Sequence, residues 1–312
     1  RTTRMSDAPI LTIAIPTYHR DHIIFKTIEN VRRYMDDRME LIIADQNESH
    51  EASVRERLSG LQSEGVIRWI ETHQQSLPQA RNIVLLGSRA PIVLFLDDDV
   101  IIPDGFLQAH LRAHEDKLAA AVTGQVYNCR PGSAVPDISN PGEGTDKLFS
   151  LPGRQYGVSV SGCNHSVKRG PLMDIGGYDT RFIGAALGED LDMARRLLMA
   201  GHEILYEPDA WLLHLRTPMG GSRIDSGTAW KEWSNSACLF LQAFRHGLRR
   251  GNFRQLLWAA MRNGPLRRQI VMRPWRWPGA FLSALYGLCY GFCFRNDVRG
   301  LKNIRLTKDV IT

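Results

Sequence analysis

The chain has 312 residues, 43% of them hydrophobic and 23% charged, with a formal net charge of +6. This composition is that of a folded globular protein; no low-complexity tract or internal repeat indicates a disordered chain or a solenoid. Residues 1–9 lack the apolar core of a signal peptide. The five cysteines are scattered without a C-x-x-C pair, which argues against a disulfide framework or structural zinc site and favours a cytoplasmic protein.

The first third of the chain alternates short apolar runs with helical patterns. The predicted strands are Ile10–Ile15, Leu41–Ala44, Ile67–Ile70 and Ile92–Leu96, and the predicted helices lie near Ile23–Tyr34, Ala52–Leu61 and Pro78–Leu86. Strands that are apolar throughout and separated by helices indicate an α/β fold, with a mostly parallel sheet covered on both faces. Ligands bind such sheets outside the carboxyl ends of the strands, so the residues that follow each run are the functional candidates.

The second third is more mixed. Pro131–Gly153 is rich in Gly, Pro, Ser and Asp and predicts a long surface loop, whereas Gly157–Val167 resembles a strand. A helix is expected from Glu189 through Ala200, ended by a glycine. Two further strands are expected, around Glu203–Tyr206 and Ala210–Leu213.

Three consecutive aspartates, Asp97, Asp98 and Asp99, directly follow the fourth strand. Their charges repel one another, and a hard divalent cation such as Mg²⁺ or Mn²⁺ relieves that repulsion while binding substrate phosphates. The alternative is an acidic turn that caps the next helix at Asp104. A G-x-G-x-x-G sequence after the first strand and a P-loop are both absent, which disfavours a nicotinamide dehydrogenase and a P-loop kinase.

A second acidic cluster, Glu189, Asp190 and Asp192, lies at the start of a predicted helix. Acidic residues are common there because they complement the helix dipole. Two clusters in one α/β chain are better explained together. One would hold a metal and a diphosphate, and the other would supply a base for an acceptor.

Five short motifs occur in the order found in family 2 glycosyltransferases. They are Ile15-Pro16-Thr17-Tyr18, Ala80-Arg81-Asn82, Phe95-Leu96-Asp97-Asp98-Asp99, Gly176-Gly177-Tyr178-Asp179 and Gly188-Glu189-Asp190. The chain resembles that family over about residues 9–215, and most of all its bacterial members that build capsular polysaccharide or exopolysaccharide. The resemblance implies the GT-A fold and transfer of a sugar from a nucleotide donor, with a UDP-sugar favoured.

Carried over by position, the resemblance implies a nucleotide-sugar site. Its residues would be Pro16, Thr17, Tyr18, Arg20, Asp45, Arg81, Asp97 and Asp98. Arg20 would lie close to the diphosphate, Asp45 would accept a hydrogen bond from the base ring, Arg81 would bridge the donor and Asp97 would touch the ribose. The family usually ends its second strand in two acids, whereas here Ala44 precedes Asp45, so the base contact depends on a single carboxylate.

The resemblance also implies the catalytic groups. Asp99 and His214 would bind the metal, which neutralises charge on the leaving diphosphate. Asp190 would take the proton from the acceptor hydroxyl, with Glu189 as the alternative base; a general base contributes about 10²–10⁴-fold. Attack opposite the leaving group would invert the anomeric carbon. The acceptor expected is a saccharide or a lipid-linked sugar.

The last part of the chain has a different composition. We divide the chain into a catalytic domain, residues 1–228, and a basic helical region, residues 229–312. Trp233–Asn296 contains ten arginines and not one Asp or Glu. Within it, the sixteen residues Gly279–Phe294 are uncharged and apolar, too few to span a bilayer, which takes about 20. Arginine and tryptophan on their flanks favour contact with the inner face of the plasma membrane; a buried helix or a homodimer contact are the alternatives.

Two rival functions remain open at this stage. Arginines interleaved with aromatic residues suit a polyanion-binding or nucleic-acid-binding protein, but this leaves both acidic clusters without a role, so we expect no nucleic-acid partner. A sugar nucleotidyltransferase also uses a metal and an α/β sheet, but the chain lacks its glycine-rich basic loop after the first strand. His110 and His114 have zinc-ligand spacing, yet Leu111 replaces the glutamate of the protease motif, and we expect a solvated helix face.

Overall fold

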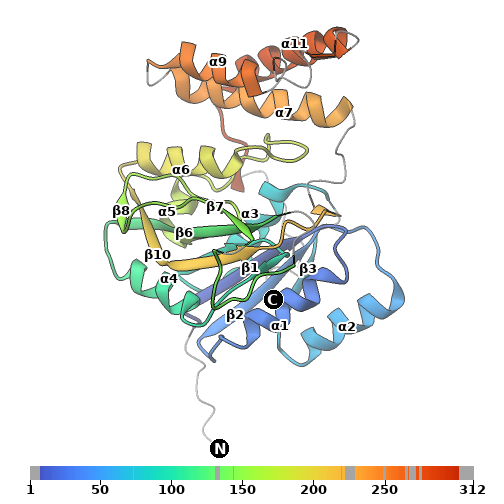
Figure 1. Ribbon diagram of the computed structural model, residues 1–312, viewed down its shortest axis with the longest axis vertical. Helices are drawn as coiled ribbons and strands as arrows, with labels where there is room; N and C mark the ends of the chain where they lie inside the picture. Colours follow the sequence, from blue (N-terminus) through green and yellow to red (C-terminus); the bar gives the residue numbers. More distant parts are fainter. Residues whose placement is uncertain are drawn as a thin grey trace, which may run out of the picture.

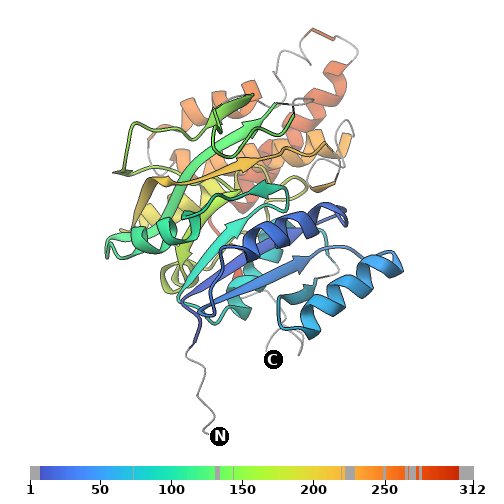
Figure 2. The same ribbon diagram turned by 60° about the horizontal axis from the view of Figure 1, so that its bottom comes forward.

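A computed structural model describes residues 8–72, 74–130, 134–142, 144–218, 220–221, 229–248, 251–263, 266, 272–273 and 276–301. Figures 1 and 2 show a sheet with helices on both faces and a stack of helices from the end of the chain above it. The sheet has ten strands. They are β1 (Leu11–Thr17), β2 (Met39–Asp45), β3 (Arg68–Glu71), β4 (Ile92–Leu96), β5 (Val100–Ile101), β6 (Ala119–Cys129), β7 (Thr145–Leu148), β8 (Gln155–Tyr156), β9 (Asn164–Lys168) and β10 (Glu203–His214).

The strand order is β3-β2-β1-β4-β9-β6-β10-β5, with β7 paired to β6 and β8 to β10. The pairs β1–β2, β1–β4, β2–β3 and β6–β10 are parallel, whereas β9 runs antiparallel to both of its neighbours. The carboxyl ends of β1 and β2 therefore lie at one edge, as do those of β4 and β10. This mostly parallel α/β sheet confirms the predicted fold class.

Six helices cover the two faces of the sheet. They are α1 (Ile23–Arg32), α2 (Ala52–Ser63), α3 (Leu77–Gly87), α4 (Phe106–His114), α5 (Arg169–Asp174) and α6 (Glu189–Met199). Apolar residues of α1, α2 and α4 form one core with Ile13 and Ile15, while α3, α5 and α6 form the other with Ala14. Successive residues of β1 thus point to opposite faces, and both faces are buried.

The predicted strands and helices of the first third are confirmed, to within a few residues at their ends. Farther along, the two strands expected after α6 form one strand, β10, which contains a register shift between Glu207 and Leu212. The interruption that the sequence suggests is therefore a bulge and not a turn. A short strand, β7, lies within the expected loop Pro131–Gly153.

The prediction of a solvated face for His110 and His114 is wrong. Both histidines are buried, and both bind the hydroxyl of Ser166 on β9, at 2.8 Å. The Nε2 atom of His110 also lies 3.0 Å from the Asn164 Oδ1 atom. These contacts turn the α4 histidines toward the sheet, where they serve packing and hydrogen bonding.

After residue 228, the described part of the chain contains four helical segments. They are α7 (Ala229–Gln242), a π-helical turn η2 (Ala243–Gly247), α9 (Phe253–Asn263) and α11 (Trp277–Phe294). α11 lies against α7 (Figure 1). Gly287 permits this approach, since a Cβ atom there would lie 2.6 Å from the Phe240 ring. The chain then returns to the catalytic domain, where the Thr180 and Leu301 amides donate to the Arg299 and Gly176 carbonyls, respectively.

Candidate active site

Two cavities meet at the carboxyl ends of β1, β4 and β10. The first, of about 100 Å³, is lined by Pro16, Tyr18, Arg20, Gln46, Gln75, Leu77, Asp97, Asp98, Gly184, His214 and Gly221. The second is an open cleft of about 570 Å³, and Asp190 and Glu189 are among its lining residues. Asp97, His214 and Leu77 line both. A small molecule in the first cavity and another in the cleft would therefore touch at these side chains.

Asp99 is the most enclosed carboxylate of the first cluster, with no exposed surface. Its Oδ2 atom accepts a hydrogen bond from the Thr217 amide at 2.8 Å. Its Oδ1 atom lies 3.0 Å from the Arg20 guanidinium and 3.2 Å from the His214 Nε2 atom. Burial raises the pKa of Asp99, but His214 and Arg20 outweigh burial and lower it, so this group is anionic at neutral pH.

Asp98 is held by Thr17, the last residue of β1, and by Arg20, which follows that strand. Arg20 donates to its Oδ1 atom at 2.5 Å, and the Thr17 hydroxyl donates to its Oδ2 atom at 2.7 Å. Burial raises the pKa of Asp98 to about 6, although Arg20 opposes that rise. Thr17 and Asp98 thus shape the wall of the first cavity by fixing Arg20.

The donor atoms suit a hard divalent cation. One ligand atom each from Asp97, Asp99 and His214 lie within 4.8 Å of one another. The Asn128 Oδ1 atom lies 2.9 Å from the Nδ1 atom of His214, and the Nε2 atom faces the aspartates. With a cation bound, a proton on Nδ1 donated to Asn128 would leave the Nε2 lone pair as the metal ligand. The buried Oδ1 atom of Asp99 has no hydrogen-bond partner within the part of the chain described. The three residues therefore fit a Mn²⁺ or Mg²⁺ ion.

Both carboxylate oxygens of Asp45 already have hydrogen-bond partners within the protein. Its Oδ1 atom accepts from Asn47, while its Oδ2 atom lies 2.6 Å from the His50 ring and accepts from Trp69 at 2.8 Å. The structure places the next residue, Gln46, on the wall of the first cavity and leaves Asp45 behind it, without exposed surface. The expected contact of Asp45 with a base ring is therefore not available in this conformation.

The cleft contains the second acidic cluster. Asp190 is partly exposed in it, and its Oδ1 atom accepts from the Leu191 amide at 2.7 Å. Glu189 is buried and forms an ion pair with Arg81, which also donates to the Gly162 carbonyl at 2.8 Å. Burial raises the pKa of Glu189 well above its usual range, and the Arg81 guanidinium works against that rise. Of the two acids, Asp190 is the one that a molecule in the cleft can reach.

Arg81, which was expected to bridge the donor, instead pairs with Glu189 in this structure. It lines the cleft and not the first cavity, and its pairing with Glu189 ties α3 to the start of α6. Sequence reasoning missed Leu77, Gly184 and Phe149, which line one or both cavities. Residues of these types carry no chemical signal, so only the tertiary structure reveals them.

Comparison with known proteins agrees with this geometry. Residues 12–164 match the model of the family described as Glycosyl transferase family 2. These residues form a family 2 glycosyltransferase domain. The match begins in β1 and ends at Asn164, so it contains the Asp97–Asp99 cluster but not α6. For these residues, the match favours a glycosyltransferase over the nucleotidyltransferase alternative.

Two curated relatives are similar to this chain. The succinoglycan biosynthesis protein ExoM of Rhizobium meliloti (strain 1021) is 29% identical over 56% of this chain and 56% of its own length. The validoxylamine A glucosyltransferase of Streptomyces hygroscopicus subsp. limoneus is 23% identical over 66% of this chain and 51% of its own. The chain thus spans about half the length of the relatives it matches.

Two solved structures share the fold. A mannosyltransferase from Pyrobaculum calidifontis, in complex with GDP-Man and Mn²⁺, has a TM-score of 0.55 and 19% identity, over 89% of this chain and 74% of its own. GalNAc-T7 with UDP, GalNAc and Mn²⁺ has a TM-score of 0.54 and 12% identity, over 80% of this chain and 54% of its own. The GT-A fold expected of this glycosyltransferase is thereby confirmed.

Proposed function

We propose that this glycosyltransferase moves a sugar from a nucleoside-diphosphate donor, UDP-linked in the first instance, to a hydroxyl of a saccharide acceptor, with inversion and with Mn²⁺ or Mg²⁺. The observation that carries the proposal is the meeting of the two cavities at Asp97 and His214. The first cavity, with Arg20 and Asp97 on its wall, suits the phosphate groups of the donor, and the cleft with Asp190 suits the acceptor. The similar structures, one with GDP-Man and Mn²⁺ and the other with UDP, GalNAc and Mn²⁺, support this assignment.

Each residue has a role in the proposed reaction. Pro16 and Tyr18 line the first cavity, where the donor would enter, and Arg20 neutralises phosphate oxygens there. Asp97, Asp99 and His214 would hold the cation, which supplies Lewis-acid stabilisation of the leaving diphosphate. Asp190 accepts the proton of the acceptor hydroxyl as its oxygen forms a bond to the anomeric carbon and the bond from that carbon to the diphosphate breaks. One displacement of this kind inverts the configuration.

The proposed activity can be tested with a panel of donors. The protein is incubated with UDP-, GDP- and dTDP-sugars, an oligosaccharide acceptor, and Mn²⁺, Mg²⁺ or EDTA. Release of nucleoside diphosphate that needs acceptor and cation is expected, with product of inverted anomeric configuration by NMR. Retention of configuration would contradict the single displacement, and full turnover in EDTA would contradict the metal. Release of pyrophosphate from a nucleoside triphosphate and a sugar phosphate would instead indicate a nucleotidyltransferase.

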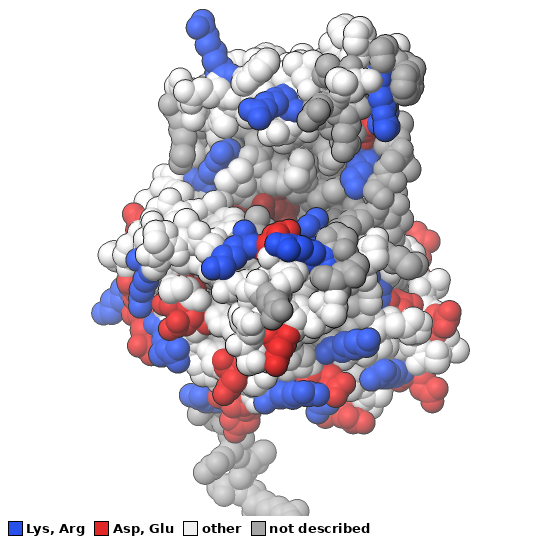
Figure 3. All heavy atoms as spheres, viewed as in Figure 1, with Lys and Arg blue, Asp and Glu red and all other residues white. Residues whose placement is uncertain are grey.

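The C-terminal helices support a second proposal, contact with an anionic membrane surface that presents a lipid-linked acceptor. α11 exposes an apolar face on which Phe281 is 69% and Phe292 54% exposed. No helix in the described part of the chain has both the length and the apolar character needed to span a bilayer. Arg254, Arg262 and Arg273 are exposed nearby, and Figure 3 shows the upper part of the molecule with basic side chains and little acidic surface. Trp275 and four arginines of the segment, Arg249, Arg250, Arg267 and Arg268, lie outside the described residues.

The ten arginines do not all contribute to that surface. Arg245 is buried and pairs with Asp179 and Asp192, and Arg276 pairs with Glu232. Each basic residue that remains near an anionic surface adds about 1 kcal/mol to binding. The proposal therefore rests on the exposed apolar face of α11 together with the exposed arginines.

Liposome sedimentation tests this contact. Bound protein should increase with anionic lipid content and decrease with salt, because the charge term is screened. The double substitution Phe281→Ser with Leu285→Ser should abolish binding, while Val135→Ser, which changes an exposed apolar residue of the catalytic domain, should not. If the protein sediments alone as a dimer and the double variant as a monomer, with no liposome binding by either, α11 is a homodimer contact instead.

A further inference from the structure

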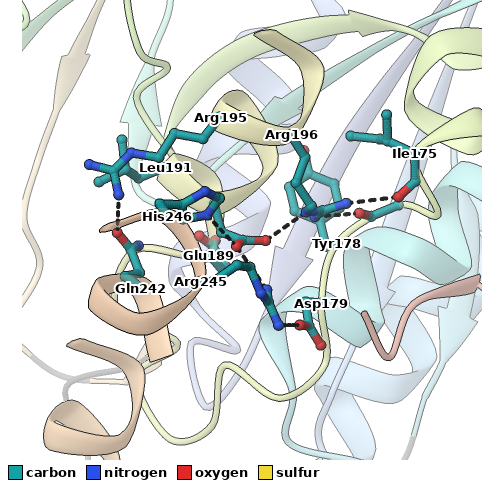
Figure 4. A network of polar contacts seen from close by, with 12 residues as sticks. Ile175, Tyr178, Asp179, Glu189, Leu191, Arg195, Arg196, Gln242, Arg245 and His246 are labelled. Carbon is teal, nitrogen blue, oxygen red and sulfur yellow. Dashed lines mark hydrogen bonds and ion pairs between the residues drawn. The ribbon is translucent and has the colours of Figure 1, made fainter. Parts of the chain in front are cut away.

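The interface between α6 and the C-terminal helices contains a fully buried carboxylate, Asp192, with no exposed surface. It lies two residues after Asp190, in the first turn of α6. Its Oδ2 atom accepts from the Arg196 Nε atom at 2.7 Å, and its Oδ1 atom accepts from the Arg245 Nη1 atom at 2.8 Å and lies 2.9 Å from the His246 Nε2 atom. Figure 4 shows Arg245 and His246 converging on this helix from the C-terminal region.

Arg245 and His246 belong to a π-helical turn, η2, which directly follows α7. A π-turn holds one more residue than an α-turn, and single π-turns inside helices are costly and concentrate at functional positions. Here two consecutive side chains of η2 reach the same carboxylate oxygen. The irregular turn thus serves the contact with Asp192.

Gln242, the last residue of α7, fixes the turn that starts α6. Its amide nitrogen donates to the Gly188 carbonyl, and its Oε1 atom accepts from Arg195 at 3.0 Å. Gly188 has φ of +83°, and a Cβ atom at this position would lie 2.1 Å from the Gln242 nitrogen. The residue before Glu189 and Asp190 is therefore clamped between the backbone turn and the C-terminal region.

Arg245 connects α6 to a second catalytic-domain segment as well. Its Nη2 atom donates to the Asp179 Oδ2 atom at 2.7 Å and to the Asp297 carbonyl at 2.8 Å. Asp179 belongs to the Gly176-Gly177-Tyr178-Asp179 motif. Buried ion pairs add little to stability compared with apolar packing, but they define one geometry. The network therefore joins α6 to that motif in one geometry.

We propose that Gln242, Arg245 and His246 are positioning residues that place Asp190 in the cleft by holding Gly188 and Asp192. The C-terminal helices are then part of the catalytic apparatus. The proposal rests on the proposed function in so far as Asp190 acts as the base there. It also makes a claim that does not depend on turnover, namely that the first turn of α6 is ordered by the C-terminal region.

Gln242→Ala is the first test because it removes the contacts with Gly188 and Arg195 without leaving a buried charge. Its matched control is Tyr290→Phe, which removes a 2.8 Å hydrogen bond from the same helical region to the Arg181 carbonyl, away from α6. Misplacement of a catalytic group lowers rates by up to about 10²-fold. We expect kcat to fall about 10- to 100-fold in Gln242→Ala with the donor KM within about twofold, and no such fall in Tyr290→Phe.

Arg245→Lys keeps the positive charge, but the single nitrogen of a lysine side chain cannot contact both Asp192 and Asp179 as the two guanidinium nitrogens do. Its kcat should therefore lie between those of the wild type and Gln242→Ala. Hydrogen exchange, read by mass spectrometry on peptides covering residues 186–193, should be faster in Gln242→Ala and unchanged in Tyr290→Phe. All assays are run below the unfolding transition of the least stable variant.

Wild-type exchange rates in residues 186–193 of Gln242→Ala, or an unchanged kcat despite faster exchange, would overturn the positioning role. Equal loss of kcat in Gln242→Ala and Tyr290→Phe would do the same, since it would reflect general loosening of the interface. If the wild-type protein transfers no sugar from any donor, the proposed function fails, and the exchange experiment still decides whether these residues order the start of α6.

Discussion

The two acidic clusters of this protein differ in how their charges are compensated. Asp97–Asp99 follow β4, and the basic side chains near them are Arg20, which follows β1, and His214, which ends β10. Asp192 of α6 instead receives Arg196, Arg245 and His246, which satisfy both of its oxygens. Asp99 retains a buried oxygen without a hydrogen bond among the residues described. The helix cluster is thus satisfied by protein groups, whereas the strand-end cluster keeps ligand atoms for the divalent cation that we propose to bind there.

This difference separates binding from positioning. A carboxylate that accepts three charged or polar donors has little capacity left for a ligand, and Arg196 and Arg245 help to hold the pKa of Asp192 far below its usual range despite its burial. Asp190, two residues earlier, is partly exposed and faces the cleft. One helix turn therefore holds both an anchor and the group proposed to move a proton.

The largest effect is expected at the strand-end cluster. Asp99→Asn removes the charge of a proposed metal ligand, and Lewis-acid stabilisation amounts to several kcal/mol, so turnover should fall by at least about 10³-fold. Binding of UDP in the presence of Mn²⁺, measured by calorimetry, should weaken as well. Asp104→Asn, an exposed acid in the same segment, is the control and should keep wild-type turnover. Wild-type turnover in Asp99→Asn at the same Mn²⁺ concentration would contradict the metal assignment.

The next effect is expected at the cleft. Asp190→Asn should lower kcat by at least about 10²-fold, the scale of a lost general base, and leave the donor Kd nearly unchanged. Glu189→Gln is the companion variant. It replaces the carboxylate that pairs with Arg81 by a neutral amide, so its main effect should be lower stability, measured as a decrease in Tm. A dead Glu189→Gln beside an active Asp190→Asn would assign the base to Glu189.

A smaller effect, on the pH dependence of stability, is expected from buried histidines that lack a carboxylate partner. Burial lowers the pKa of His110 to about 4, while its value in an unfolded chain is 6.5. Between these pH values the unfolded state therefore binds more protons than the folded state. The contribution of His110 to the free energy of unfolding has its full value above about pH 6.5 and decreases as the pH falls toward about 4. His246, beside Asp192, shows the contrasting case, in which a carboxylate opposes the effect of burial.

Urea unfolding of wild type and His110→Gln between pH 7.5 and pH 4.5 tests this difference. The variant should be less stable at pH 7.5, and its deficit should shrink by at least about 1 kcal/mol at the acid end. Leu118→Ala, an exposed apolar change, should follow the wild-type curve in parallel. A deficit that stays constant with pH would mean that His110 is not neutral in the folded protein.

Much of the fold could be predicted from the sequence. The runs at β1, β2, β3 and β4 are apolar on both faces because helices cover both sides of a parallel sheet, and local periodicity records this burial directly. The aspartates after β4 could be recognised for the same reason, since polar residues that end a buried strand stand out. The helix α6 and the strand that ends in His214 were also predicted from local pattern, and the family motifs added the roles of Asp190 and His214.

The tertiary structure decided which polar groups meet. His110 faces Ser166 rather than water, Asp45 is enclosed by His50 and Trp69, and Arg245 pairs with Asp192 across 53 residues of sequence. The local pattern fixes the path of a backbone segment, because burial repeats with the period of a strand or a helix. It does not fix the partner of a polar side chain, because that depends on which segments adjoin after the strands have paired and the C-terminal helices have docked on α6.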